Sequence, residues 1–178
     1  MPTIAVFGSS EPLPDEPLYR TARELGGLLA EAGHRVITGG YGGVMEAASR
    51  GARERGGSTV GVICDIFSAR DPNPYLDRVV PSTDLYERTR ELIQRADGFV
   101  VLEGKAGTLA ELSFLWALQR ARCLRPSTVV LLGGRLHTLI KELKRCEMLE
   151  NPQIAATRLA RSPQEAVRLL ESAPATGS

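Results

Sequence analysis

The sequence predicts an α/β fold, a doubly wound and mostly parallel sheet with helices on both faces. Short runs rich in valine, isoleucine and leucine alternate with longer segments in which apolar residues recur every three or four positions. Several short runs end in a glycine-bearing turn that leads into a helical segment. Such alternation is typical of parallel sheets, and 178 residues suit a single domain. We place that domain at 1–172, followed by a frayed tail at 173–178.

The first predicted strand is Thr3–Phe7, a β-branched and aromatic run closed by Gly8, which indicates burial on both faces. After a proline-rich loop, leucines and alanines recur at helical spacing over 17–32. Gly33 is a plausible stop for this helix, since glycine readily adopts the left-handed conformation that ends many helices. The segment 34–38 then predicts a second strand.

A second glycine turn, 39–43, leads into a helix predicted at 44–55, which ends at a Gly-Gly pair. The third predicted strand is 58–63. Residues 64–81 are expected to be less regular, because two prolines disfavour helix at the residues before them. A loop of that length in a compact domain is often functional.

The central part of the chain begins with an N-cap signal at 82–84 for a helix that runs to about Ala96. The apolar run 98–102 predicts a buried strand and is followed by a Gly-Lys-Ala-Gly turn. In the next predicted helix, 109–121, apolar residues cover most of the circumference. We therefore expect this helix to be covered on more than one side, and a subunit interface would supply the extra cover.

The last predicted elements are strands at 127–132 and 155–159 and helices at 136–144 and 163–171. Ser162 at the N-cap, Pro163 at the first helical position and Glu165 two residues later are typical of a helix start.

The three glycine-bearing turns predict an anion site. All three follow strands, so in a parallel sheet they lie at one edge, beyond the carboxyl ends of the strands. Helix N-termini carry unpaired N–H groups and partial positive charge, glycines let a ligand approach the backbone, and Lys105 adds a full charge. The residues that we expect to bind a phosphate or nucleotide are Gly8, Ser9, Gly39, Gly40, Gly43, Gly104, Lys105, Gly107 and Thr108.

A structural interpretation of the third turn is equally open from the residues alone. Thr108 and Glu111 have the spacing of a capping box, in which the threonine side chain caps the helix and the glutamate reaches back to the N-cap amide. In that case the turn would start a helix without binding a ligand.

Composition excludes several classes of function. Lysine and arginine total 22 against 21 aspartate and glutamate residues, and this balance favours neither nucleic acid nor an anionic membrane. No apolar run approaches the length of a membrane span. The three cysteines, at positions 64, 123 and 146, lack the spacing of disulfides or of a metal site, so we expect buried or partly buried thiols, a cytoplasmic location and no metal.

Common catalytic and cofactor motifs are missing from the sequence. The second turn lacks the third glycine of the dinucleotide fingerprint, and the Walker pattern and the Gly-x-Ser-x-Gly elbow are absent. His34 and His137 are isolated, so we expect a strand-start and a helix-start residue instead of catalytic bases. No cofactor is expected.

Taken together, the turns resemble the Lonely guy (LOG) family over about residues 3–145. The resemblance is carried by Gly8-Ser9-Ser10, by Gly39-Gly40-x-x-Gly43-Val44-Met45, by an arginine in the helix before the central strand and by Gly104-x-x-Gly107-Thr108-x-x-Glu111. This chain departs from the family signature P-G-G-x-G-T-x-x-E at Glu103 and Lys105, and Thr89 replaces the lysine that follows the family's arginine. Glu46 likewise stands where the family has the second glycine of G-L-M-G.

The resemblance implies a Rossmann-like fold and a nucleoside 5′-monophosphate phosphoribohydrolase, which releases a free base and ribose 5-phosphate. Arg88 and Glu111 match the family's catalytic arginine and glutamate. A carboxylate beside the ribose would stabilise oxocarbenium-like charge or orient water, and an arginine would hold phosphate or sugar oxygens. A homodimer with sites near its interface is also implied.

Three alternatives remain open. The fold family includes proteins that resemble carriers of a phosphorylated pterin such as the molybdenum cofactor, so the chain would bind a ligand without turnover. A purely structural dimer module would bind no anion. Arg88 itself would be an ordinary surface arginine if it paired with Asp84 or Glu91, its neighbours along the helix.

Overall fold

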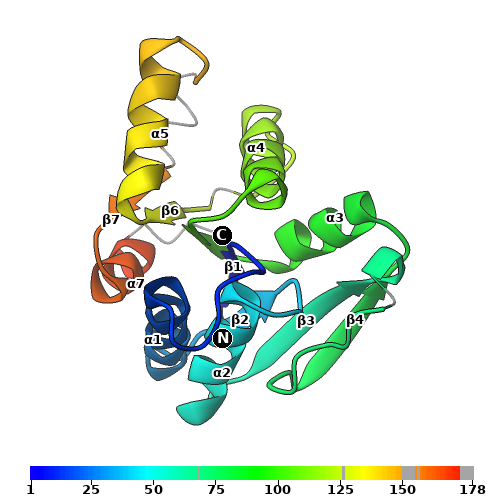
Figure 1. Cartoon of the computed structure of the whole chain (residues 1–178). Coiled ribbons are helices and arrows are strands. Elements are labelled where there is room, and N and C mark those ends of the chain that lie inside the picture. Colours follow the sequence, from blue (N-terminus) through cyan, green and yellow to red (C-terminus); the bar gives the residue numbers. More distant parts are fainter. Residues whose placement is uncertain (68, 126, 150–154, 156, 173–178) are drawn as a thin grey trace.

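The computed structural model describes residues 1–67, 69–125, 127–149, 155 and 157–172. Seven strands form one sheet in the order β4-β3-β2-β1-β5-β6-β7 (Figure 1). Every neighbouring pair is parallel. The order reverses between β1 and β5, where the chain crosses from one half of the sheet to the other. The predicted α/β class and parallel sheet are confirmed.

The strands are short, and β1, β5 and β6 at the centre of the sheet are buried along their whole length. In chain order the strands are β1 (Thr3–Phe7), β2 (Arg35–Thr38), β3 (Thr59–Cys64), β4 (Arg78–Ser82), β5 (Gly98–Leu102), β6 (Val129–Leu132) and β7 (Thr157–Ala160). Alternate residues of β1 point to opposite faces, so Ile4 and Val6 belong to one core cluster and Ala5 and Phe7 to the other. A strand buried on both faces is continuously apolar for this reason.

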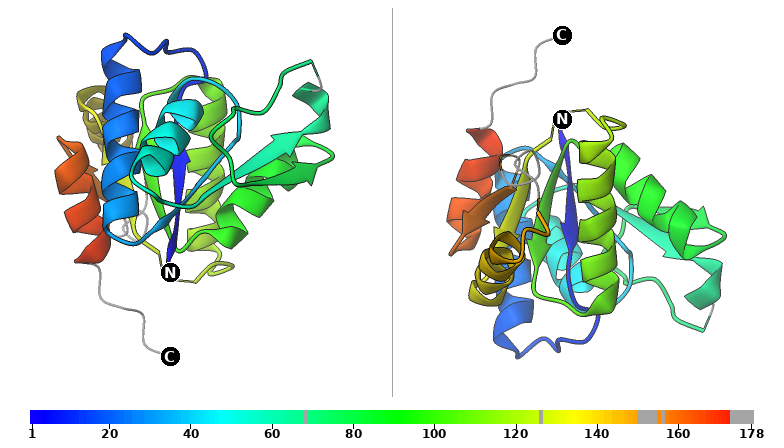
Figure 2. Two further views of the ribbon diagram at one scale, coloured as in Figure 1. Left: turned by 90° about the horizontal axis from the view of Figure 1, so that it is seen from below. Right: turned by 90° about the horizontal axis from the view of Figure 1, so that it is seen from above.

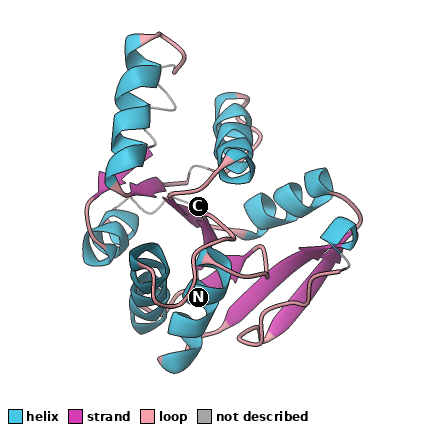
Figure 3. Ribbon diagram, viewed as in Figure 1, coloured by secondary structure: helices cyan, strands magenta, loops and turns pink. Residues whose placement is uncertain are grey.

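Helices cover both faces of the sheet (Figures 2 and 3). One core cluster packs α1 (Pro17–Glu31), α2 (Val44–Glu54) and α7 (Pro163–Glu171) against the sheet, and the other packs α3 (Leu85–Arg95), α4 (Ala106–Arg120) and α5 (Gly134–Arg145). The doubly wound arrangement that the sequence predicts is therefore present. Among the described residues, none of the helices is long and apolar enough to span a membrane.

The glycine stop at Gly33 is confirmed. Gly33 has φ +77°, its N–H donates to Ala30 O, and the next N–H, of His34, donates to Leu29 O. These two hydrogen bonds are the Schellman pattern, which satisfies the last carbonyl groups of α1.

The segment 64–81 is more ordered than the sequence predicted. It contains a 3₁₀ turn at Asp65–Phe67 and, from Arg78, the edge strand β4. Pro81 lies in β4 opposite Ile63, and proline is tolerated there because an edge strand has one side without a partner strand. The strand was also missed because Arg78 and Val79 are exposed at the sheet edge, and such a strand does not form the continuous apolar run by which buried strands are predicted.

Other element bounds differ by a few residues from the prediction. Helix α4 begins three residues earlier than expected, at Ala106, and β6 begins at Val129. Strand β7 is shifted to Thr157–Ala160, and residue 156 of the predicted strand lies outside the described residues. The tail predicted at 173–178 also lies outside them.

Candidate functional site

The three glycine-bearing turns meet around Ser9, at the carboxyl edge of the sheet. Ser9 N–H donates to Glu103 O in the turn after β5 (3.1 Å), and Ser9 O accepts from Val44 N–H at the start of α2 (2.8 Å). Gly43 makes this approach possible, because its φ is +67° and an added Cβ would lie 2.4 Å from Ser9 O. Segments far apart in the sequence are thus joined by backbone hydrogen bonds.

A pocket of about 220 Å³ lies beside this junction. Its wall is contributed by the end of β1, the turn after β2, the segment after β3, and the first turns of α3 and α4. The lining residues are Val6, Phe7, Gly8, Ser9, Ser10, Glu11, Gly39, Tyr41, Met45, Phe67, Arg70, Leu85, Arg88, Lys105, Gly107, Thr108 and Glu111.

Arg88 is a buried cation held in place by backbone carbonyl groups. It lies in the first turn of α3, whose N-cap is Asp84. Its Nε donates to Val62 O and its Nη2 to Gly39 O, each at 3.0 Å. Since the Arg88 residue is only 8% exposed, these bonds are needed to offset the loss of hydration. They also fix the direction of the guanidinium.

Glu111 meets Arg88 across the pocket from the second turn of α4. Arg88 Nη1 and Glu111 Oε1 are 3.5 Å apart, and only 14% of the Glu111 side chain is exposed. Burial raises the pKa of the Glu111 carboxyl from its ordinary 4.5 to about 7, although the Arg88 cation opposes the shift. This carboxyl therefore exchanges a proton near neutral pH, as general acids and bases do.

The interpretation of Arg88 as an ordinary surface residue is wrong. Asp84 accepts a hydrogen bond from Glu87 N–H as the cap of α3, and Glu91 pairs with Arg95. Arg88 points across the sheet edge to another helix instead of along its own.

Tyr41 forms one side of the pocket and is held on several sides. Its ring lies 5.8 Å from the Arg88 guanidinium carbon and makes an edge contact with Phe67 at 5.6 Å. Its hydroxyl group accepts from Cys64 N–H (2.9 Å) and donates to Cys64 O (3.1 Å). The buried Asn73 side chain donates to Tyr41 O, which ties the segment 65–77 to the second turn.

Helix α4 begins at the pocket with no side chain capping it. Its N-cap is Lys105, so Thr108 lies within the first turn and Glu111 faces Arg88. The capping-box interpretation of these two residues is wrong, because the helix starts three residues before the position that it requires. The Lys105 ammonium pairs instead with the Glu11 carboxylate, 2.7 Å away.

The structure brings most of the predicted site residues to one pocket. Those that line it are Gly8, Ser9, Gly39, Lys105, Gly107, Thr108, Arg88 and Glu111. Gly40, Gly43 and Gly104 do not line it. Gly40 and Gly43 have positive φ angles within the second turn, and Gly104 packs against Thr108, whose Oγ1 would lie 2.1 Å from an added Cβ.

Several pocket residues were not predicted. Tyr41 stands between two glycines of the predicted binding turn 39–43, and that position could have made it a candidate. Arg70 and Phe67 belong to the segment 64–81, and no pattern distinguishes them there. Only the folded chain shows that they face the end of β1.

The cysteines and histidines lie outside the pocket lining. Cys64 is buried as expected, but Cys123 and Cys146 are exposed, so the prediction of burial is wrong for these two. His137 lies in the first turn of α5, and its Nε2 lies 3.0 Å from Ala160 O. His34 directly precedes β2.

A family model decides the relationship of this chain to known proteins. The model of the SLOG cluster4 family matches residues 1–160. The chain belongs to the SLOG cluster4 family. The resemblance to the LOG family, predicted from the glycine turns with Arg88 and Glu111, is thereby confirmed.

Relatives of this SLOG cluster4 chain include an uncharacterized protein and a named enzyme. An uncharacterized protein of Archaeoglobus fulgidus is 33% identical over 131 residues, which cover 71% of this chain and 82% of that protein. A cytokinin riboside 5′-monophosphate phosphoribohydrolase of Mycobacterium tuberculosis is 34% identical over 116 residues. That alignment covers 64% of this chain and 62% of the enzyme, so it spans less than two thirds of the enzyme's length.

Among solved structures, the molybdenum cofactor binding protein of Rippkaea orientalis superimposes on this SLOG cluster4 chain with a TM-score of 0.77. The two are 25% identical, and the match covers 96% of each chain. The chain is thus similar to proteins of two kinds, a hydrolase and a binding protein.

Proposed function

We propose that this protein binds a nucleoside 5′-monophosphate in the pocket and hydrolyses its N-glycosidic bond. The products are a free base and ribose 5-phosphate. The observation that carries the proposal is the buried pair of Arg88 and Glu111, 3.5 Å apart, in a pocket formed by three strand-end turns and the N-terminus of α4. Similarity to the phosphoribohydrolase of Mycobacterium tuberculosis supports it.

Each part of the pocket has a role in this reaction. The amides at the start of α4, with Lys105 beside them, suit the phosphate group. Arg88 orients phosphate or sugar oxygens with its fixed guanidinium. The Glu111 carboxylate accepts a proton from water, whose oxygen bonds to C1′ of the ribose as the bond from C1′ to the base nitrogen breaks. Carboxylates act in this way on oxocarbenium-like transition states of glycoside hydrolysis. The departing base keeps the electron pair of that bond and takes up a proton from solvent, and Glu111 releases its own proton to solvent.

The pKa of Glu111 gives the reaction a pH dependence. Because the carboxylate is the active form and its pKa is about 7, kcat/KM should rise as pH increases through about 7. The Glu111→Gln variant cannot ionise and should lack this rise.

The decisive experiment measures free base released from a panel of nucleoside monophosphates. We expect release from at least one of them, and a loss of at least about 100-fold in Glu111→Gln, the scale of general-base catalysis. Calorimetry should still detect binding of the nucleotide to this variant, because the α4 amides and Lys105 are unchanged. An undiminished rate in Glu111→Gln would refute the role of Glu111.

A second candidate function is that of a carrier for a phosphorylated pterin such as the molybdenum cofactor. The superposition on the molybdenum cofactor binding protein over 96% of each chain favours it. Glu103 and Lys105, which depart from the hydrolase motif, favour it as well. Tight binding of a pterin phosphate, with no base released from any nucleotide, would support the carrier. Failure to bind either class of ligand would leave a structural module.

A further inference from the structure

Two carboxylates line the pocket, and each is paired with a cation that lines it too. Glu111 and Arg88 form the buried pair. Glu11 and Lys105 form the second pair, in which the lysine Nζ lies 2.8 Å from Glu11 Oε1 and 2.7 Å from Oε2. This second pair is open to solvent, since 76% of the Lys105 side chain and 62% of the Glu11 side chain are exposed.

The two cations differ in how easily they change partner. Backbone carbonyl groups of Val62 and Gly39 hold the Arg88 guanidinium, and these bonds do not involve Glu111. The Lys105 ammonium has Glu11 as its acceptor in the described structure and lies at the end of a flexible chain. Exposed ion pairs of this kind contribute little to stability, so a stronger anion can displace Glu11.

Glu11 is held beside Lys105 at the start of α4. Its N–H donates to Ser9 Oγ (3.2 Å), and Ser9 joins the three turns. Glu11 and Lys105 line both the 220 Å³ pocket and a neighbouring cavity of about 340 Å³ on the α5 side. The pair therefore stands between the two cavities, directly at the uncapped start of α4.

We propose that Glu11 is an internal competitor for the phosphate group of the ligand and that Lys105 is the cation for which the two compete. A phosphate monoester displaces the Glu11 carboxylate, forms an ion pair with the Lys105 ammonium and accepts hydrogen bonds from the first amides of α4. Glu11 thereby selects ligands whose charge is high enough to replace it, and weakly charged anions are rejected. This inference rests on the proposed phosphate site, but it concerns affinity and not turnover.

The test compares the affinity for AMP and for inorganic phosphate, measured by calorimetry, among wild type and three variants. Glu11→Gln should bind both probes about threefold to tenfold more tightly, because the competitor and its repulsion of the phosphate are gone. Lys105→Gln should bind them more weakly by about the same factor. The gain in affinity caused by Glu11→Gln should be smaller in a protein that also carries Lys105→Gln than in one that retains Lys105. Glu16→Gln is the matched control, because Glu16 lines only the neighbouring cavity; its affinity should equal that of wild type.

Unchanged or weaker binding by Glu11→Gln would overturn the inference, and so would failure of both wild type and Glu11→Gln to bind either probe. Binding by Glu11→Gln alone would support it, since the competitor would then exclude the anion in wild type. Base release from AMP is measured separately on the same samples. AMP that binds without releasing base would contradict the hydrolase function, while the affinities would still decide the role of Glu11.

Discussion

A single glycine, Gly39, leaves room for the buried side chain of Arg88. An added Cβ on Gly39 would lie 1.6 Å from Arg88 Nη2 and 2.6 Å from Met45 Sδ, so no other residue fits there unless the guanidinium moves. Gly42 in the same turn has more space around it. Gly42 has only Ser10 O, at an ordinary 3.6 Å, near the position of an added Cβ.

Gly39→Ala should therefore leave the protein folded but displace Arg88 from Glu111. Because a misplaced positioning group impairs catalysis strongly, we expect base release to fall by at least about tenfold. Gly42→Ala is the matched control in the same turn and should keep the wild-type rate within about twofold, since its added methyl group meets only ordinary contacts. Equal rates for the two variants would contradict this account of Gly39.

Glu111 makes a pH-dependent contribution to stability whose sign follows from its raised pKa. The folded protein keeps the Glu111 proton up to a pH of about 7, while the unfolded chain loses it near 4.5. Wild type should therefore lose stability relative to Glu111→Gln as pH rises between these values, by up to about 3 kcal/mol. The value of about 7 already includes the opposing effect of the Arg88 cation.

Urea unfolding of wild type and Glu111→Gln at several pH values between 4 and 8 measures this difference. A difference in free energy of unfolding that stays constant over the whole range would show that Glu111 titrates alike in the folded and unfolded states.

At the scale of single elements, the helix ends differ in how well the sequence suits the backbone. Two residues after the end of α1, Gly33 adopts the left-handed conformation, whereas the corresponding residues after α4 and α5 are Arg122 and Glu147, each at φ +55°. The hydrogen bonds that close α4 are of the same kind as those that close α1: Cys123 N–H donates to Leu118 O. A side chain in this conformation carries a steric cost that glycine avoids.

Arg122→Gly and Glu147→Gly should each stabilise the protein by about 0.5–1 kcal/mol, because both side chains are exposed and only the backbone term changes. Gly33→Ala is the complementary control. Nothing lies within 4 Å of an added Cβ at Gly33, so its expected loss of about 1 kcal/mol comes from φ alone. Thermal unfolding measures all three; stabilisation by Gly33→Ala would refute the backbone argument.

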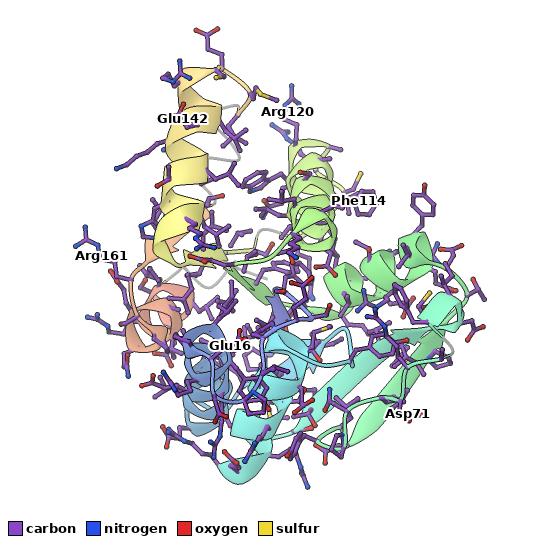
Figure 4. The ribbon with its side chains drawn as sticks, viewed as in Figure 1. Glu16, Asp71, Phe114, Arg120, Glu142 and Arg161 are labelled. Atoms are coloured by element: carbon purple, nitrogen blue, oxygen red, sulfur yellow. The ribbon has the colours of Figure 1, made fainter. Side chains whose placement is uncertain are left out.

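At the scale of the whole molecule, helices α3 and α4 present apolar side chains to solvent. Leu85 and Tyr86 on α3 and Leu109 and Phe114 on α4 are all exposed. Figure 4 shows Phe114 projecting from α4 on the side opposite α5. Phe114 lies three residues after Glu111, and residues at this spacing share a helix face. The apolar residues that the sequence shows around α4 are thus not all covered within one chain.

We propose that a second copy covers Phe114 of α4 and the exposed apolar residues of α3, which makes the protein a homodimer with its sites near the interface. Phe114→Asp should then reduce the mass measured by light scattering to that of one chain, because a charge would replace a buried aromatic group in the interface. Phe114→Leu should retain the dimer. A wild-type protein that has the mass of one chain at high concentration would contradict the proposal.

The sequence by itself determined the parallel α/β architecture and the three strand-end turns, and the order of its motifs singled out Arg88 and Glu111 as candidates, because period, glycine position and motif order are local signals. It did not reveal the edge strand β4, whose residues are partly exposed and include a proline. Only the tertiary structure decided that Glu111 faces Arg88 instead of capping α4, that burial raises its pKa, and that Glu11 pairs with Lys105. The physical reason is that ion pairs and desolvation depend on which distant segments the fold brings within a few ångströms, and no spacing along the chain encodes that distance.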